Sequence, residues 1–319
     1  MTEPPAFLDS TRPHVPDLAV PRGVTPFYIP GQPVRGRLVR LGPLAETLLA
    51  RHEHTVPVKA LLGQALALAA ALATALKFKG SFSVQARGDG PVPMLLADCT
   101  DAGALRGYAR MREDAAIAPD ATAGAMLGTG YLAFTVDFGL DRDPQQGIVA
   151  LEGGTLAAMA EHYFTQSEQL AARVFLAAAP TDAGWRASAL VLERVAGAGG
   201  VAPDMPENIQ DEAWRTACIL AETITTAELL DDALTPERLL YRLFHGEGVA
   251  VAKPRPLSFG CRCSRARLSG ILEGFPEDDL DHMAVEGDIV MTCEFCNFDF
   301  RFPRAAIAGR PTLPPGASS

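Results

Sequence analysis

The sequence predicts an α+β protein made of a mixed sheet-and-helix core, a helical linker and a small cysteine-rich domain. Strand-like and helix-like patterns are mixed between residues 34 and 197, and the lack of regular βαβ alternation favours an α+β fold. A Gly/Pro/Ala-rich stretch at 197–206 is typical of a domain boundary. Four of the six cysteines then fall within 256–305, which marks a separate C-terminal module.

The N-terminal half supplies the elements of the core. Residues 1–33 hold eight prolines and little apolar periodicity, so we expect a Pro-rich mobile arm there. The core domain follows at 34–197. Apolar alternation and short apolar runs predict strands at Val34–Leu41, Phe82–Ala86, Val92–Ala97, Tyr131–Phe138, Gly147–Leu151, Gln169–Ala178 and Trp185–Val195. Helical spacing predicts helices at Leu44–His54, Pro57–Phe78 and Leu156–Phe164.

The segment 198–255 is expected to be a helical, redox-sensitive linker. Apolar residues recur at helical spacing from Ala213 to Ala227, and Pro236 can begin a second helix with an apolar stripe that ends at Phe244. These helices have no core of their own, so they must pack on the domain before or after them. Loosening of that neighbour exposes them; a linker that always stays packed is the plain structural alternative.

Charge and hydropathy exclude several classes of partner. The net charge is −10, and residues 256–305 hold five Arg, no Lys and nine Asp or Glu, so we expect no nucleic-acid partner. The apolar run Ala60–Leu76 is short and Ala-rich, which predicts a buried core helix rather than a membrane span. No basic and apolar secretory segment follows Met1. We therefore expect a cytoplasmic protein, in which paired cysteines bind metal or sense redox state.

The cysteine pattern predicts a metal site. Cys261 and Cys263 form a CxC pair, Cys293 and Cys296 form a CxxC pair, and 29 residues separate the two pairs. Two such pairs can converge on one tetrahedral Zn²⁺. Ile289–Thr292 reads as a strand that leads into the CxxC knuckle, and alternating phenylalanines predict a returning strand. We expect this zinc domain at 256–305 and a disordered tail at 306–319.

The CxC pair also indicates a second state. One intervening residue is fewer than structural zinc sites usually have, and such a pair can close as a strained, labile disulfide. The pattern therefore favours a switch over a permanent clip, although a purely structural zinc site or unrelated thiols remain the simpler interpretations. His282, between the pairs, is an alternative ligand.

Catalytic motifs are mostly absent. No GxxxxGK[ST] sequence occurs, so we expect no nucleotide, and Gly128-Thr129-Gly130 lacks the third glycine of a dinucleotide fingerprint. His52 and His54 are expected to face solvent. Cys99 and Cys218 are single and lie in apolar stretches, so we expect buried small side chains.

With these motifs in place, the chain resembles the 33 kDa chaperonin family of redox-regulated heat-shock holdases over residues 34–303. The resemblance is carried by Val34-Arg35-Gly36, Ala75–Gly80, Arg87–Pro91, Leu151–Ala158, Tyr163-Phe164, Ser167–Leu170, Leu240–His245 and Cys261–Arg265. Two features depart from the family: Ala171-Ala172 stand where a Pro-Thr pair is expected, and the Pro-rich arm is longer than usual.

The resemblance implies a mechanism. The reduced protein would be an inactive, zinc-bound monomer held by Cys261, Cys263, Cys293 and Cys296. Peroxide or hypochlorite, helped by heat, would form Cys261–Cys263 and Cys293–Cys296 disulfides and release zinc. The linker would then unfold, and the protein would form a homodimer and hold unfolded client proteins without ATP.

Two other classes of function stay open at this point. A thiol-disulfide oxidoreductase could use Cys293 and Cys296 as a catalytic dithiol, although a strand pattern rather than a helix follows the CxxC. An enzyme could instead have its active site in 34–197 and a structural zinc ribbon, but no catalytic constellation supports it. We therefore expect a chaperone, not an enzyme.

Overall fold

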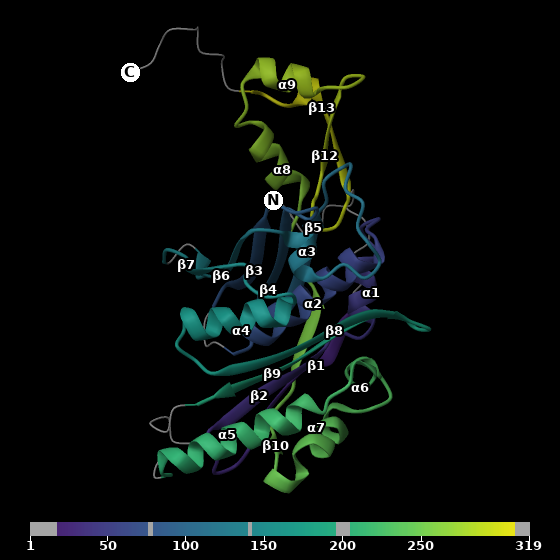
Figure 1. The fold of residues 1–319 in the computed structure, drawn as a ribbon. Helices are drawn as coiled ribbons and strands as arrows, with labels where there is room; N and C mark the ends of the chain where they lie inside the picture. The colour runs from purple at the N-terminus through teal and green to yellow at the C-terminus, as the bar shows by residue number, and fades with distance from the viewer. Residues whose placement is uncertain (1–17, 76–78, 140–141, 196–204, 310–319) are drawn as a thin grey trace, which may run out of the picture. The chain divides into compact units, whose positions relative to one another are not determined.

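The computed structural model describes residues 18–75, 79–139, 142–195 and 205–309. The chain divides into two compact units, Asp17–Gly260 and a second unit that contains residues 261–309 (Figure 1). Helices and strands are mixed in both units, which confirms the predicted α+β class. The linker segment belongs to the first unit and is not a separate body.

The first unit is built on one large sheet. Its strand order is β7-β6-β3-β4-β5-β11-β1-β2-β9-β8, with β10 beside β1. The strands are β1 (Ala19–Tyr28), β2 (Val34–Arg40), β3 (Ser81–Gly88), β4 (Met94–Thr100), β5 (Ala104–Arg110), β6 (Gly130–Asp137), β7 (Gln145–Ala150), β8 (Ala172–Thr181), β9 (Gly184–Arg194), β10 (Ala250–Val251) and β11 (Arg255–Phe259). Seven of them overlap the predicted strands.

Strand β11 joins the two antiparallel halves of this sheet. It runs parallel to β5, with Ser258 opposite Ala104 and Phe259 opposite Leu105, and antiparallel to β1 across an irregularity between Val20 and Val24. The centre of the strand, Leu257, is fully buried. Because only Gly260 separates the end of β11 from Cys261, the last strand of the sheet leads directly into the cysteine-rich unit.

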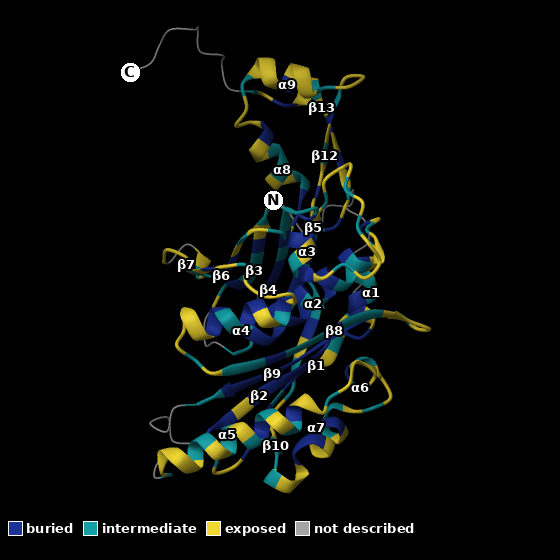
Figure 2. Ribbon diagram, viewed as in Figure 1, coloured by how far each residue is buried: buried dark blue, intermediate teal, exposed yellow. Residues whose placement is uncertain are grey.

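One face of the sheet is covered by helices α1 (Pro43–Leu49), α2 (Val56–Ala73) and α4 (Leu156–Gln166), and the short α3 (Ala123–Leu127) packs into the same core. Helix α2 is buried along most of its length (Figure 2). It is the one helix in the described ranges long and apolar enough to cross a membrane, but 72% of its apolar window is buried inside the protein. The predicted buried core helix is therefore confirmed.

The other face of the sheet is covered by helices α5 (Glu207–Glu222), α6 (Thr226–Leu230) and α7 (Pro236–Phe244), followed by the turn η4 (His245–Glu247). Their apolar side chains form one cluster with those of β1, β2, β8 and β9, and the Phe27 ring stacks on Phe244 with centroids 5.5 Å apart. The linker helices thus pack on the preceding domain. The predicted helix through Ala227 ends at Glu222, because Thr225 begins α6 with a capping box.

Three predicted boundaries are wrong. Residues 18–33 do not form a mobile arm, since β1 pairs with β2, β10 and β11; residues 1–17 lie outside the described part. Residues 256–260 belong to the large sheet and not to the zinc domain. The chain stays ordered past 305, where Ile307 is buried; residues 310–319 again lie outside the described part.

The second unit is small. It contains helices α8 (Arg265–Leu272) and α9 (Glu277–Met283), a two-stranded sheet of β12 (Asp288–Thr292) and β13 (Asp299–Pro303), and the turn η5 (Arg304–Ala306). The predicted strand at Ile289–Thr292 is confirmed, and Phe300 and Phe302 supply the buried face of the returning strand.

Candidate metal centre

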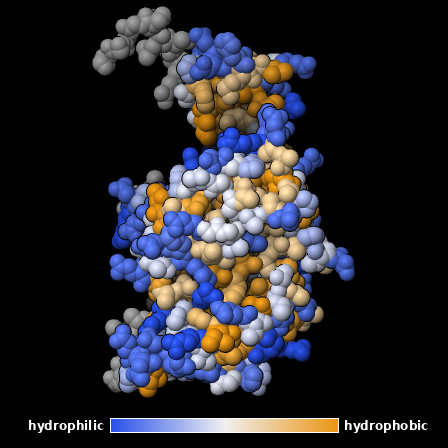
Figure 3. Space-filling view, viewed as in Figure 1, coloured by the Kyte–Doolittle hydropathy of each residue, from blue (hydrophilic) through white to orange (hydrophobic). Residues whose placement is uncertain are grey.

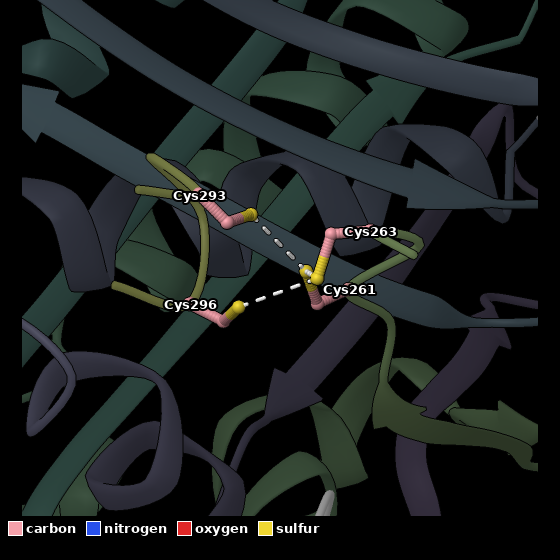
Figure 4. A group of neighbouring side chains, drawn as sticks. All are labelled: Cys261, Cys263, Cys293 and Cys296. Carbon is pink, nitrogen blue, oxygen red and sulfur yellow. Dashed lines mark hydrogen bonds between the residues drawn. The ribbon is translucent and has the colours of Figure 1, made fainter. Parts of the chain in front are cut away.

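Four cysteine sulfurs converge on one point (Figure 4). The Sγ atoms of Cys261, Cys263, Cys293 and Cys296 all lie within 4.8 Å of one another. The separations are 3.3 Å for Cys261–Cys263, 3.7 Å for Cys261–Cys293 and 3.5 Å for Cys263–Cys296. A tetrahedron with Zn–S bonds of about 2.3 Å has edges of about 3.8 Å. The cluster therefore has the ligand type and nearly the spacing that a Cys₄ zinc site requires.

Local backbone structure presents each pair. Cys261 and Cys263 lie in the loop between β11 and α8. Ser264 follows them, and its side chain caps α8 by accepting a hydrogen bond from Arg267 N. Cys293 and Cys296 lie in the turn between β12 and β13, where Asn297 N donates to Cys293 O at 2.7 Å. Asn297 has φ +54, a left-handed conformation that asparagine tolerates. Two loops thus aim their thiols at the same point.

The electrostatics of the cluster favour a cation. The hydrogen bond with Cys263 lowers the pKa of Cys261 to about 7, and the hydrogen bond with Cys261 lowers the pKa of Cys293. The same neighbours raise the pKa of Cys263 and of Cys296. Four buried thiols thus compete for protons, and a bound dication would let all four become thiolates together.

The unit around the cluster has a small core. Its buried apolar side chains include Leu272, Leu280, Ile289, Phe300 and Phe302, and the Arg265 guanidinium lies 4.8 Å from the Phe302 ring centroid. A module of this size rarely buries enough apolar surface to fold securely without a metal or disulfide. The cysteine cluster is therefore the natural source of its stability.

Other residues singled out in the sequence lie elsewhere. His282 is on α9, bonded to the Asp278 carbonyl and outside the cysteine group. Cys99 is buried as expected, but Cys218 is only half-buried on α5. The expectation that His52 and His54 face solvent is wrong: His52 is buried, and the two rings stack with centroids 5.1 Å apart. Both follow α1, and His54 is hydrogen-bonded to the backbone of Ala109 in β5.

Sequence reasoning missed a set of buried arginines on the face of the sheet beneath the linker helices. The guanidinium of Arg40 donates to the carbonyl oxygens of Glu228, Asp231 and Leu234, and that of Arg186 pairs with Asp232 at 2.6 Å. A signal was present, because both arginines alternate with apolar residues along a predicted strand. An arginine in such a position needs a partner.

Comparison with known proteins identifies the class. A family model described as "Hsp33 protein" matches residues 23–303. The "33 kDa chaperonin" of Caulobacter vibrioides is 40% identical over 284 residues, which cover 86% of this chain and 92% of the relative. That of Pseudomonas fluorescens is 37% identical, covering 88% and 91%. The chain belongs to the Hsp33 family of chaperones, and this placement supports a chaperone rather than an enzyme.

The fold agrees with a solved relative. The crystal structure of the 33 kDa chaperonin (heat shock protein 33 homolog) of Thermotoga maritima matches with a TM-score of 0.74, covering 90% of this chain and 96% of that one at 22% sequence identity. This similarity supports the α+β fold.

Proposed function

We propose that this chaperone is a redox-regulated holdase, which holds unfolding proteins without ATP and is switched on when its cysteine cluster is oxidised. The observation that carries the proposal is the convergence of four buried thiols within 4.8 Å in a unit with few other sources of stability. Zn²⁺ is the proposed ion, with Cys261, Cys263, Cys293 and Cys296 as its ligands. We propose that the protein acts in the cytoplasm and uses no nucleotide.

The bound ion would hold the four sulfurs as thiolates, the form that peroxide oxidises. Each disulfide, Cys261–Cys263 or Cys293–Cys296, forms as two thiolates give up two electrons. One peroxide takes those electrons with two protons and becomes two water molecules. Two peroxides therefore consume all four thiolates, and no ligand for the ion remains.

Loss of the metal site would unfold the small unit. Structural zinc supplies on the order of 10–16 kcal/mol of apparent binding free energy, whereas small domains have about 5 kcal/mol of stability or less. The two disulfides close very short loops and restore little of this. Residues 261–309 are therefore expected to become a flexible chain.

Unfolding of the cysteine-rich unit would then spread to the linker along the chain. Gly260 N donates to Leu105 O at 2.8 Å next to Cys261, so β11 is the first element of the sheet that is reached along the chain from an unfolded C-terminal unit. β10 and α7 precede it directly along the chain. Loosening in this order would uncover the apolar cluster between the sheet and α5–α7, and we propose that clients bind there and that the oxidised protein forms a homodimer.

Limited proteolysis tests the coupling. The reduced, zinc-bound protein should resist cleavage across 205–305, and the oxidised, zinc-free protein should be cut throughout that region while β2–β6 remain protected. Identical cleavage patterns for the two states would overturn the proposed switch.

A further inference from the structure

The linker and the sheet beneath it carry opposite charges. Residues 207–247 contain nine Asp or Glu and three Arg, a formal charge of −6. Strands β1, β2, β8 and β9 contain seven arginines and a single acidic residue, Glu193. Because Glu193 pairs with Arg35 and Arg37, the carboxylate partners of the other arginines come from elsewhere in the chain.

Strand periodicity places four of these arginines on the linker side. In β9 the even-numbered residues face the linker cluster, which puts Arg186 and Arg194 at the two ends of Leu190 and Leu192. By the same alternation, Arg40 follows Val34 and Leu38 in β2. Arg173 precedes Phe175 and Ala177 in β8. The sheet face is thus an apolar centre bordered by guanidinium groups.

Linker carboxylates pair with three of these border arginines and also with Arg22 of β1. Arg186 pairs with Asp232 and Arg194 with Asp211, each at 2.6 Å. Arg173 pairs with Glu222, and Arg22 of β1 pairs with Glu237 of α7. Arg173 also forms an ion pair with Glu161 of α4, with 3.2 Å between Nη1 and Oε2. Departure of the linker would therefore take away the carboxylates that pair with Arg22, Arg186 and Arg194.

Arg40 adds a deeper positive charge. Only 8% of it is exposed, and the oxygens that accept its hydrogen bonds all belong to linker carbonyls. Burial lowers its pKa, and the nearby Asp231 and Asp232 oppose that shift. When α6 and α7 leave, this guanidinium loses those acceptors to water, and a carboxylate on a bound chain could take their place.

We infer that the uncovered sheet face selects client segments in which apolar side chains are interspersed with Asp or Glu. This inference rests on the proposed function, and it specifies the client class for the surface that oxidation exposes. An acidic amphipathic segment fills the apolar centre and gives carboxylates to Arg22, Arg186 and Arg194. A lysine-rich segment of equal hydrophobicity meets like charge at the same border.

The solvent-facing side of helix α5 differs from the sheet face that the linker covers. The space-filling view shows a largely hydrophilic exterior over α5, with small hydrophobic patches (Figure 3). Ala217 and Ala221 of α5 are buried, whereas Ile219 is exposed. The large apolar and basic surface therefore lies under the helices and is available to clients only when they leave.

Peptide binding by the oxidised full-length protein tests the inference. Three fluorescein-labelled peptides, matched to α5 at 16 residues, share their apolar positions and carry Glu, Gln or Lys at the polar ones. The Glu peptide should bind about tenfold more tightly than the Lys peptide at low salt, since several exposed ion pairs contribute together, and the difference should shrink at high salt. The Gln peptide should bind with intermediate affinity.

Two matched double variants distinguish the role of the sheet-face arginines from that of the linker carboxylates that cover them. R186Q/R194Q and D211N/D232N remove the same two ion pairs between linker and sheet, so each weakens the packing of the linker on the sheet. Only R186Q/R194Q should lose most of the preference for the Glu peptide, and R186K/R194K should restore much of it. The D211N/D232N protein should keep the full preference.

The outcomes distinguish this inference from the proposed function. Equal binding of all three peptides by an oxidised protein that still suppresses client aggregation overturns the charge preference alone. A preference that survives in R186Q/R194Q places client binding elsewhere, such as on the linker, and also overturns it. Loss of aggregation suppression in the oxidised wild type would instead contradict the proposed function.

Discussion

Individual cysteines carry the clearest information in this chain. The spacing of Cys261, Cys263, Cys293 and Cys296 predicts their convergence because paired cysteines on two loops are typical of a zinc site. The environment of single residues is harder to predict. Nothing in the local sequence distinguishes a buried His52 from an exposed one, because burial depends on how the rest of the chain folds.

Replacing one ligand should remove the metal. In C263S, three thiolates remain, and we expect zinc content to fall from one equivalent to near zero after dialysis. The reduced variant should be protease-sensitive at 261–309 and should suppress aggregation without oxidant. C218S, which changes a thiol on α5, should retain zinc. A full equivalent of zinc in C263S would exclude it as a ligand.

His54 should make the core sensitive to acid. Burial, with His52 and Lys59 nearby, lowers its pKa from 6.5 to about 4. The unfolded chain therefore binds more protons between pH 6.5 and 4, so stability present at pH 7 is lost as pH falls through this window. For a half-buried ring we expect a loss of about 1 kcal/mol at pH 5. Urea unfolding at pH 7 and pH 5 should show a smaller difference for H54Q; an equal difference would remove His54 as the cause.

At the scale of elements, strongly patterned segments were predictable and irregular ones were not. Pro236 and the stripe to Phe244 predict α7 with its buried face. Strand β1 was not predicted because it contains Pro21 and Pro26, and proline has no backbone N–H to donate to a neighbouring strand. Strand β11 was not predicted because its five residues are too few to show a periodic pattern.

Cys218 should report on the packing of α5. Burial raises its pKa from 9.0 to about 11, so unfolding of the linker should increase its thiolate fraction at pH 8 by about 100-fold. After oxidation and removal of oxidant, iodoacetamide should modify Cys218 at least ~10-fold faster than in the reduced protein. Cys99, buried in β4, should stay slow in both states. An unchanged rate at Cys218 would show that α5 remains packed.

At the scale of the whole molecule, β11 connects the two half-sheets and the cysteine-rich unit. No local pattern predicts this arrangement, because it depends on pairing β5 with a strand roughly 150 residues later in the chain. The family resemblance predicts the order of the parts. It does not by itself indicate that the boundary of the cysteine-rich unit lies at Cys261.

Weakening β11 should loosen the sheet without touching the metal site. Leu257 is fully buried, so L257A should cost about 2–5 kcal/mol. We expect a lower urea midpoint and earlier cleavage near 205–260, with zinc retained at one equivalent. V285A, at a position 70% exposed, should change neither. An unaltered midpoint in L257A would mean that β11 does not support the sheet.

The central claim is that the metal centre controls chaperone activity. Zinc content and suppression of aggregation of a heat-unfolded client should be measured on the same samples, reduced and after peroxide at elevated temperature. We predict one equivalent of zinc and little suppression in the reduced protein, then near-zero zinc and strong suppression without ATP after oxidation. Zinc retained after oxidation, or equal suppression in both states, would contradict the account.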